Sequence, residues 1–238
     1  EIASKVNINK ICIDVANAHT EHFVYKVKEI RHKHPKAIII AGNTVTTEMV
    51  QELLIAGADI IKVGVGPGKL CLTRDVTGCG YYQLSAIMEC SEAAKGLNGH
   101  IIADGGCRKP GDICKAFGAG AYGVMLGSLF SGTDECEAGW EYGFETKKNE
   151  KGIPIITRKQ VKKSMKFWGM SSKEAMDLHY SGMSDYRASE GKCEQIPYKG
   201  PIKDTVQEIL GGLRSCCTYC GASKLKNLSK CTTFITNK

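Results

Sequence analysis

A cysteine follows a glycine-rich turn in the segment Gly64–Gly80, which reads Gly-Val-Gly-Pro-Gly-Lys-Leu-Cys-Leu-Thr-Arg-Asp-Val-Thr-Gly-Cys-Gly. Its opening glycines and proline allow the backbone to approach a ligand closely and to point carbonyl oxygens at it. Cys71 comes directly after this turn, followed by the hydroxyl of Thr73 and the cation of Arg74. A nearby cation favours the thiolate, which is the nucleophilic form of cysteine. The segment therefore predicts a loop that presents a reactive cysteine, and a buried, inert cysteine is the alternative that these residues leave open.

The apolar pattern around this loop predicts alternating strands and helices. Short apolar runs that indicate strands lie at 11–17, 37–43, 60–66, 100–106 and 121–127. Helical periodicity follows four of them, at 23–30, 46–54, 83–95 and 110–117, and Thr46 or Thr47 is placed as an N-cap. Nearly continuous apolar strands that alternate with helices are typical of a parallel sheet covered by helices, so we expect an α/β fold.

Polar or small residues end every predicted strand. They are Asp14 and Asn17, Asn43, the Gly64 to Cys71 loop, Asp104 to Gly106, and Gly127 with Ser128. Both (β/α)₈ barrels and open doubly wound sheets carry their sites at this carboxyl edge. No glycine motif here opens a helix with an acidic residue at the dinucleotide-binding distance, so we favour the (β/α)₈ TIM barrel. Because five units are fewer than eight, we expect a single catalytic domain over 1–238 that lacks the first three barrel strands.

Residues 133–167 depart from this alternation. The stretch is strongly basic and is interrupted by three glycines and Pro154. It predicts an excursion from the barrel, either a flap-like segment over the site or a solvated surface hairpin. After it, residues 169–176 predict a helix capped by Ser171 or Ser172, and 202–213 and 221–228 predict closing helices.

Composition narrows the function classes. The chain has 238 residues, of which 42% are hydrophobic, and this is enough to bury a large core. No apolar run reaches the length of a membrane span, and the first residues lack a signal-peptide hydrophobic region, so we expect no membrane partner. The 12 cysteines are scattered singly, which favours reduced thiols in the cytosol. The net charge is +7, but the basic residues are not interleaved with aromatic residues as in nucleic-acid-binding surfaces. We therefore expect an anionic small molecule and no nucleic acid as partner.

Several separated motifs resemble the IMP dehydrogenase/GMP reductase family. The segment Gly64–Arg74 is similar to the nucleophile loop of that family, and Asp104-Gly-Gly is similar to its ribose and phosphate turn. The segments Tyr186-Arg-Ala-Ser-Glu-Gly-Lys and Arg214-Ser-Cys-Cys-Thr-Tyr-Cys-Gly-Ala-Ser-Lys-Leu resemble the reductase branch. The Arg-Tyr pair of the dehydrogenase flap has no counterpart in 133–167. Lys69 and Leu72 stand where the family more often has small hydroxyl residues.

The resemblance implies NADPH-dependent reductive deamination of GMP to IMP and ammonia. Cys71 would add to carbon 2 of the guanine ring and form a thioimidate as ammonia leaves, and hydride from NADPH would reduce it. Thr73 and Glu190 would relay the proton that ammonia needs. An IMP dehydrogenase, or a truncated purine-nucleotide-binding protein without catalysis, stays open as an alternative.

The resemblance also implies the binding residues. Asp104 would hold the ribose, and the amides of Gly105, Gly106, Gly127 and Ser128 would hold the phosphate. The purine would contact Gly169, Met170, Ser171, Arg187, Ala188, Ser189 and Gly191. NADPH would contact Asp14, Val15, Ala16, Ser215, Cys216, Cys217 and Thr218. A potassium ion would be held by carbonyls at Gly66, Gly68, Cys71 and Arg74, and the assembly would be a cytosolic homotetramer.

Overall fold

The structure is a computed structural model that describes residues 9–137, 139–179, 182 and 188–236. It divides into two compact units. The sheet unit contains the segments up to Lys69, Thr73–Leu126 and the residues from Ile209 onward. The hairpin unit contains Leu70–Leu72 and Gly127–Glu208.

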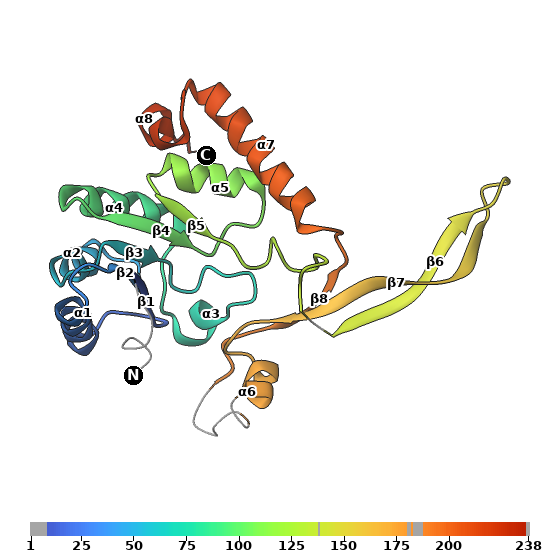
Figure 1. Cartoon of the computed structure of the whole chain (residues 1–238), viewed down its shortest axis with the longest axis horizontal. Helices are drawn as coiled ribbons and strands as arrows, with labels where there is room; N and C mark the ends of the chain where they lie inside the picture. Colours follow the sequence, from blue (N-terminus) through green and yellow to red (C-terminus); the bar gives the residue numbers. More distant parts are fainter. Residues whose placement is uncertain (1–8, 138, 180–181, 183–187, 237–238) are drawn as a thin grey trace. The chain divides into compact units, whose positions relative to one another are not determined.

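Five parallel strands in sequential order form the sheet unit. They are β1 (Lys10–Asp14), β2 (Ile38–Thr44), β3 (Ile60–Val63), β4 (His100–Asp104) and β5 (Gly123–Met125). Helices α1 (Glu21–Lys33), α2 (Thr47–Ile55), α4 (Gln83–Gly96) and α5 (Pro110–Gly118) alternate with the strands. Figure 1 shows these helices following one another beside the sheet in the order of the strands. This confirms the predicted α/β class and its five β/α units, which are those of a TIM-barrel-like fold.

Apolar side chains from strands and helices make the core of the sheet unit. Ile39, Ile61 and Ile101 on three neighbouring strands are at most 1% exposed, and Leu53 of α2 is fully buried. Thr46 caps α2 as predicted, because its side chain accepts a hydrogen bond from the amide of Met49. This packing fixes the carboxyl ends of the strands, where Asp14, Asn43 and Asp104 lie.

Three elements differ from the predicted ones. A short helix, α3 (Thr73–Thr77), follows the glycine-rich loop. Helix α7 (Ile202–Cys220) runs past residue 213 and stops before Gly221, whose φ of +72° is typical of a residue just after a helix. The helix predicted at 221–228 is replaced by the short 3₁₀ helix η1 (Leu225–Asn227) and the short α-helix α8 (Leu228–Cys231).

Antiparallel strands form the hairpin unit. Strands β6 (Trp140–Lys148), β7 (Pro154–Trp168) and β8 (Cys193–Pro197) pair in the order β6-β7-β8. The basic segment 133–167 thus contains the antiparallel pair of β6 with most of β7. Helix α6 (Lys173–His179) follows, and the hydroxyl of Ser172 caps it by accepting from the amide of Ala175.

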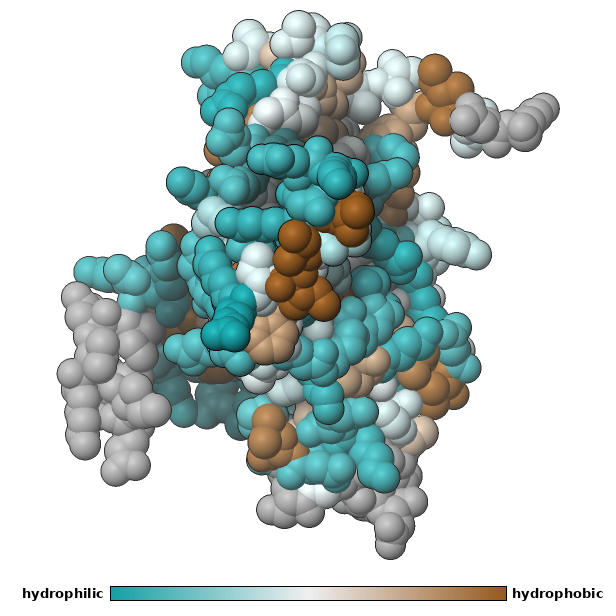
Figure 2. All heavy atoms as spheres, turned by 90° about the vertical axis from the view of Figure 1, so that its right-hand side faces the viewer, coloured by the Kyte–Doolittle hydropathy of each residue, from teal (hydrophilic) through white to brown (hydrophobic). Residues whose placement is uncertain are grey.

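The hairpin exposes apolar side chains beside its basic ones. Phe144, Ile155 and Ile156 are 51%, 51% and 72% exposed. Figure 2, seen from the side where Figure 1 labels β6 and β7, shows apolar residues in brown among hydrophilic residues in teal. Within the described residues, no helix combines the length and apolar composition needed to cross a membrane.

Candidate active site

A buried lysine joins two carboxylates at the carboxyl edge of the sheet. Lys62, in β3, is 2% exposed. Its ammonium lies 2.8 Å from Asp14 Oδ2 at the end of β1 and 3.0 Å from Asp104 Oδ2 at the end of β4. The sequence predicted both aspartates as site residues and missed Lys62. The signal that could have found this lysine is a charge inside the apolar strand Ile60–Val63.

The two carboxylates keep Lys62 charged. Burial lowers the pKa of the lysine, but hydrogen bonds to Asp14 and Asp104 and their negative charge outweigh it, so the pKa is raised above its usual value. Lys62 is therefore a cation throughout the neutral range. The cluster of one cation and two carboxylates has a net charge of −1.

Two amide side chains hold Asp104 in place. The amide nitrogen of Asn43 donates to Asp104 Oδ2 at 2.9 Å and to the carbonyl of Gly64 at 2.8 Å. The amide nitrogen of Gln83 donates to the carbonyl of Val63 at 2.8 Å and contacts that of Asp104 at 3.3 Å. In the described part of the chain, Asn43 Oδ1 and Gln83 Oε1 are buried without a hydrogen-bond partner. Such acceptors suit a donor supplied by a ligand.

The turn after Asp104 packs against the glycine-rich loop. Gly105 and Gly106 have φ values of +81° and +82°, in the left-handed region that favours glycine. A Cβ on Gly105 would lie 3.0 Å from Pro67 Cγ. The structure therefore brings the predicted ribose and phosphate turn, Asp104–Gly106, beside the predicted potassium-binding turn at Gly66 and Gly68.

The guanidinium of Arg74 donates hydrogen bonds to two carbonyls of this loop. Its Nε donates to the carbonyl of Val65 at 3.1 Å, and its Nη2 donates to the carbonyl of Tyr81. A Cβ on Gly66 would lie 2.7 Å from Arg74 Cγ, so the side chain folds closely over the loop. The guanidinium predicted to activate the cysteine is thus bound to loop carbonyls.

In the hairpin unit, Cys71 lies opposite Gly191. The two residues form an antiparallel bridge. The amide of Leu72 donates to the carbonyl of Glu190 at 2.7 Å, and the amide of Lys192 donates to the carbonyl of Leu70 at 2.8 Å. Two segments far apart in sequence are therefore paired, and they bring the predicted nucleophile Cys71 beside the predicted proton-relay residue Glu190.

The turn at 169–172 packs against the segment Glu190–Lys192, which pairs with Leu70–Leu72. The amide of Gly169 donates to the carbonyl of Lys192 at 3.0 Å, and the amide of Glu190 donates to that of Ser171 at 3.1 Å. A Cβ on Gly191 would lie 2.7 Å from the backbone nitrogen of Ser172, so the backbones touch at this glycine. The predicted purine contacts thus gather around Cys71 as follows: Gly169, Met170 and Ser171 in this turn, and Ala188, Ser189 and Gly191 in the facing segment. Arg187 lies outside the described residues.

The remaining predicted phosphate contacts, Gly127 and Ser128, open a turn in the hairpin unit. The carbonyl of Gly127 accepts from the amide of Phe130 at 3.0 Å. The carbonyl of Ser128 accepts from the Lys199 ammonium at 3.3 Å and from the Ser131 hydroxyl at 2.7 Å. These bonds occupy the carbonyls of Gly127 and Ser128 within the hairpin unit.

The predicted NADPH contacts lie on two separate parts of the sheet unit. Asp14, Val15 and Ala16 follow the edge strand β1. Ser215, Cys216, Cys217 and Thr218 lie on α7, whose Gly212 approaches Pro110 of α5 so closely that a Cβ would lie 2.9 Å from Pro110 Cβ. Helix α5 precedes β5, the opposite edge strand. The structure does not bring these two segments together within one chain.

A family profile and individual relatives of the chain point to the same protein family. A family profile described as "IMP dehydrogenase / GMP reductase domain" matches residues 2–238. The chain is 55% identical to a GMP reductase of Phytophthora infestans, over 98% of this chain and 60% of that protein. It is 55% identical to GMP reductase 1 of Homo sapiens, over 94% of this chain and 61% of that protein.

A solved structure agrees with the sequence comparison. A GMP reductase from Trypanosoma brucei in complex with guanosine 5′-monophosphate matches 95% of this chain and 44% of that chain, with a TM-score of 0.80 and 33% identity. The chain spans about 60% of the length of the curated relatives named above. The fold, the residues around Cys71 and these matches agree, and the chain belongs to the IMP dehydrogenase/GMP reductase domain family.

Proposed function

We propose that this chain carries the NADPH-dependent reductive deamination of GMP to IMP and ammonia. The observation that supports this most is the pairing of Cys71 with the Glu190–Gly191 segment and the turn at 169–172. A protein that only binds a nucleotide has no need of a thiol at this place.

In the proposed reaction, the Cys71 thiolate forms a bond to carbon 2 of the guanine ring. The exocyclic amino group takes a proton and leaves as ammonia, which gives a thioimidate. Thr73 and Glu190 deliver that proton, with the carboxylate orienting the hydroxyl. When bound, NADPH supplies the hydride that carbon 2 receives as the bond to sulfur breaks. The thiolate of Cys71 is then regenerated and IMP is released.

Asp104 is suited to hold the ribose. Both Lys62 and Asn43 bind its Oδ2. Its Oδ1 is then left to accept a hydrogen bond from a ribose hydroxyl. The left-handed turn at Gly105 and Gly106 carries no side chain, which suits it to offer backbone amides to the phosphate of the same nucleotide.

Potassium and NADPH are the proposed cofactors. The loop around Gly66 and Gly68 offers backbone carbonyls, which are oxygen ligands of the kind that potassium prefers. Asp14, 58% exposed at its side chain, is accessible to a cofactor. Since α7 and β1 lie apart in one chain, a second copy would have to present Ser215–Thr218 to a cofactor held at Asp14–Ala16. The proposed cytosolic homotetramer provides such copies.

We also propose that residues 1–238 work as one catalytic domain, with 133–167 acting as a flap-like excursion. The family profile runs through both units without a break, which supports a single domain.

The test is a spectroscopic assay of the reduced-nicotinamide band with GMP, NADPH and potassium. We expect NADPH to be consumed as IMP and ammonia form, Cys71→Ala to abolish turnover while GMP still binds, and Cys79→Ala to retain turnover. Cys79 is the matched control because it is an exposed cysteine of the same loop. Reduction of NAD with IMP, and no reaction with GMP, would indicate the dehydrogenase. Bound GMP without reaction in either direction would indicate a binding protein.

A further inference from the structure

A cavity of about 440 Å³ opens in the sheet unit between α4, α5 and the η1–α8 segment. Its lining includes His100 at the start of β4 and Tyr122 just before β5. Asp104 lies at the other end of β4, about 13 Å away at 3.3 Å per residue. The cavity is therefore at the amino edge of the sheet, opposite the edge that carries Lys62, Asp14 and Asp104. Its volume is in the range of small-molecule sites.

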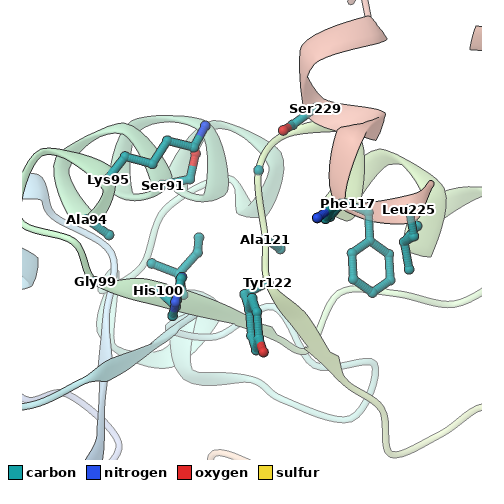
Figure 3. Close-up of a pocket in the computed structure, with 13 residues that line it drawn as sticks. Ser91, Ala94, Lys95, Gly99, His100, Phe117, Ala121, Tyr122, Leu225 and Ser229 are labelled. Atoms are coloured by element: carbon teal, nitrogen blue, oxygen red, sulfur yellow. The ribbon is translucent and has the colours of Figure 1, made fainter. Parts of the chain in front are cut away.

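Aromatic rings form one wall of this cavity. The rings of His100 and Tyr122 are stacked, with centroids 4.5 Å apart and planes 21° from parallel. Tyr122 is 66% exposed, so a large part of it remains available for contact. Figure 3 shows Phe117 and Leu225 across the hollow from Ala94 and His100, with Tyr122 at its edge. Flat apolar walls of this kind suit an aromatic ring that stacks.

Two cations reach the same cavity from different elements. Lys95 comes from the last turn of α4, and Lys226 comes from η1. Neither ammonium has an ion-pair partner among the residues that the structure describes. A Cβ on Gly120 would lie 2.6 Å from Ser91 Oγ and 3.2 Å from Lys95 Nζ, so the missing side chain of Gly120 makes room for the ammonium. Ser229 adds a hydroxyl to the lining.

We propose that this cavity is a second binding site, for a mononucleotide whose base stacks beside Tyr122 and whose phosphate is held by Lys95 and Lys226. An aromatic wall and a pair of unpaired cations lining one open pocket match the two halves of such a ligand. The 14-residue helix α4 separates this site from the catalytic edge, because Gln83 at its start contacts Asp104 and Lys95 lies in its last turn. The site is independent of the function proposed above.

Calorimetric titration of the full chain with AMP tests the site. Adenosine, which lacks the phosphate, and ribose 5-phosphate, which lacks the base, serve as comparison ligands. We expect AMP to bind at least tenfold more tightly than either probe. The double substitution Lys95→Ala with Lys226→Ala should weaken AMP binding at least tenfold. The exposed lysines Lys28 and Lys36 provide the matched control, since Lys28→Ala with Lys36→Ala makes the same change in net charge elsewhere on the sheet unit.

One further variant separates this site from the catalytic edge. Asp104→Asn should leave AMP affinity unchanged, whether or not the chain proves to be a reductase. The proposal is overturned if AMP does not bind, if AMP and adenosine bind equally, or if AMP binding survives the loss of both pocket lysines. It is also overturned if Asp104→Asn abolishes AMP binding, because the nucleotide would then occupy the catalytic edge.

Discussion

Replacing Lys62 by methionine should destabilise the protein through the carboxylates left behind. Methionine keeps most of the apolar stem but removes the ammonium that lies 2.8 Å from Asp14 and 3.0 Å from Asp104. Removing one partner of a buried ion pair costs about 3 to 5 kcal/mol. Here Asp104 is 21% exposed at its side chain and Asp14 is 58% exposed, so water recovers part of the loss. We therefore expect a cost of about 2 to 3 kcal/mol at pH 7.

The same substitution should make stability depend on pH in a defined direction. Without the cation, the two neighbouring carboxylates repel each other, and adding a proton to one of them removes this repulsion. Acid therefore relieves part of the destabilisation in the variant. The cost of Lys62→Met should therefore be smaller at pH 4 than at pH 7. Adding Asp104→Asn should recover part of the loss at pH 7, because it removes one of the repelling charges.

Urea denaturation followed by circular dichroism measures these differences. Lys28→Met on the exposed face of α1 is the control, and it should change stability by no more than about 0.5 kcal/mol. A cost below about 1 kcal/mol for Lys62→Met at pH 7, or a cost that does not fall at pH 4, would refute this role of the cluster.

Three further predictions concern other parts of the chain. Arg31→Lys should cost about 2 kcal/mol in urea denaturation, since the guanidinium donates to the Gly57 carbonyl at 2.8 Å and to Asp59 at 2.6 Å in a fork that lysine cannot copy; an unchanged midpoint would contradict this. Gly191→Ala should lower turnover at least tenfold because its Cβ would meet the backbone beside Cys71, whereas Gly111→Ala, with open space around the new Cβ, should be neutral. Burial raises the pKa of Cys90 to about 12, so its thiol should react with an alkylating reagent at pH 8 far more slowly than that of exposed Cys79. Peptide mass spectrometry measures both rates, and equal rates would contradict this. Since the thiolate is disfavoured in the folded state, Cys90 should also reduce stability as pH rises above 9.0, the ordinary pKa of the thiol.

The repeating part of the fold could be predicted because its signals are local. Apolar runs, the Thr46 cap and the turns between them each depend on a few neighbouring residues, and they indicate all five β/α units. Helix α7 was predicted to end at residue 213, whereas it continues to Cys220. Within it, Gly212 allows a close approach to Pro110.

Site residues that depend on distant partners were harder to predict. The pairing of Cys71 with Gly191 joins two loops that carry no shared local pattern. Lys62 could have been found from its charge within an apolar strand, since a buried lysine requires carboxylates around it. In the sequence, Asn43 marks only a strand end and Gln83 only a helix start. Their bonds to Asp104 depend on the parallel register of the strands, which sequence spacing does not reveal.

Attack of Cys71 on the purine is the central step, and a reaction with GMP in the absence of NADPH tests it most directly. Ammonia release and peptide mass spectrometry would be measured on the unmodified chain, on Cys71→Ala and on Cys79→Ala. We expect ammonia to be released once per site and a purine-nucleotide adduct to form on the peptide that carries Cys71. Both should be lost in Cys71→Ala and retained in Cys79→Ala. Ammonia release that survives in Cys71→Ala, or an adduct on a different cysteine, would contradict the assignment.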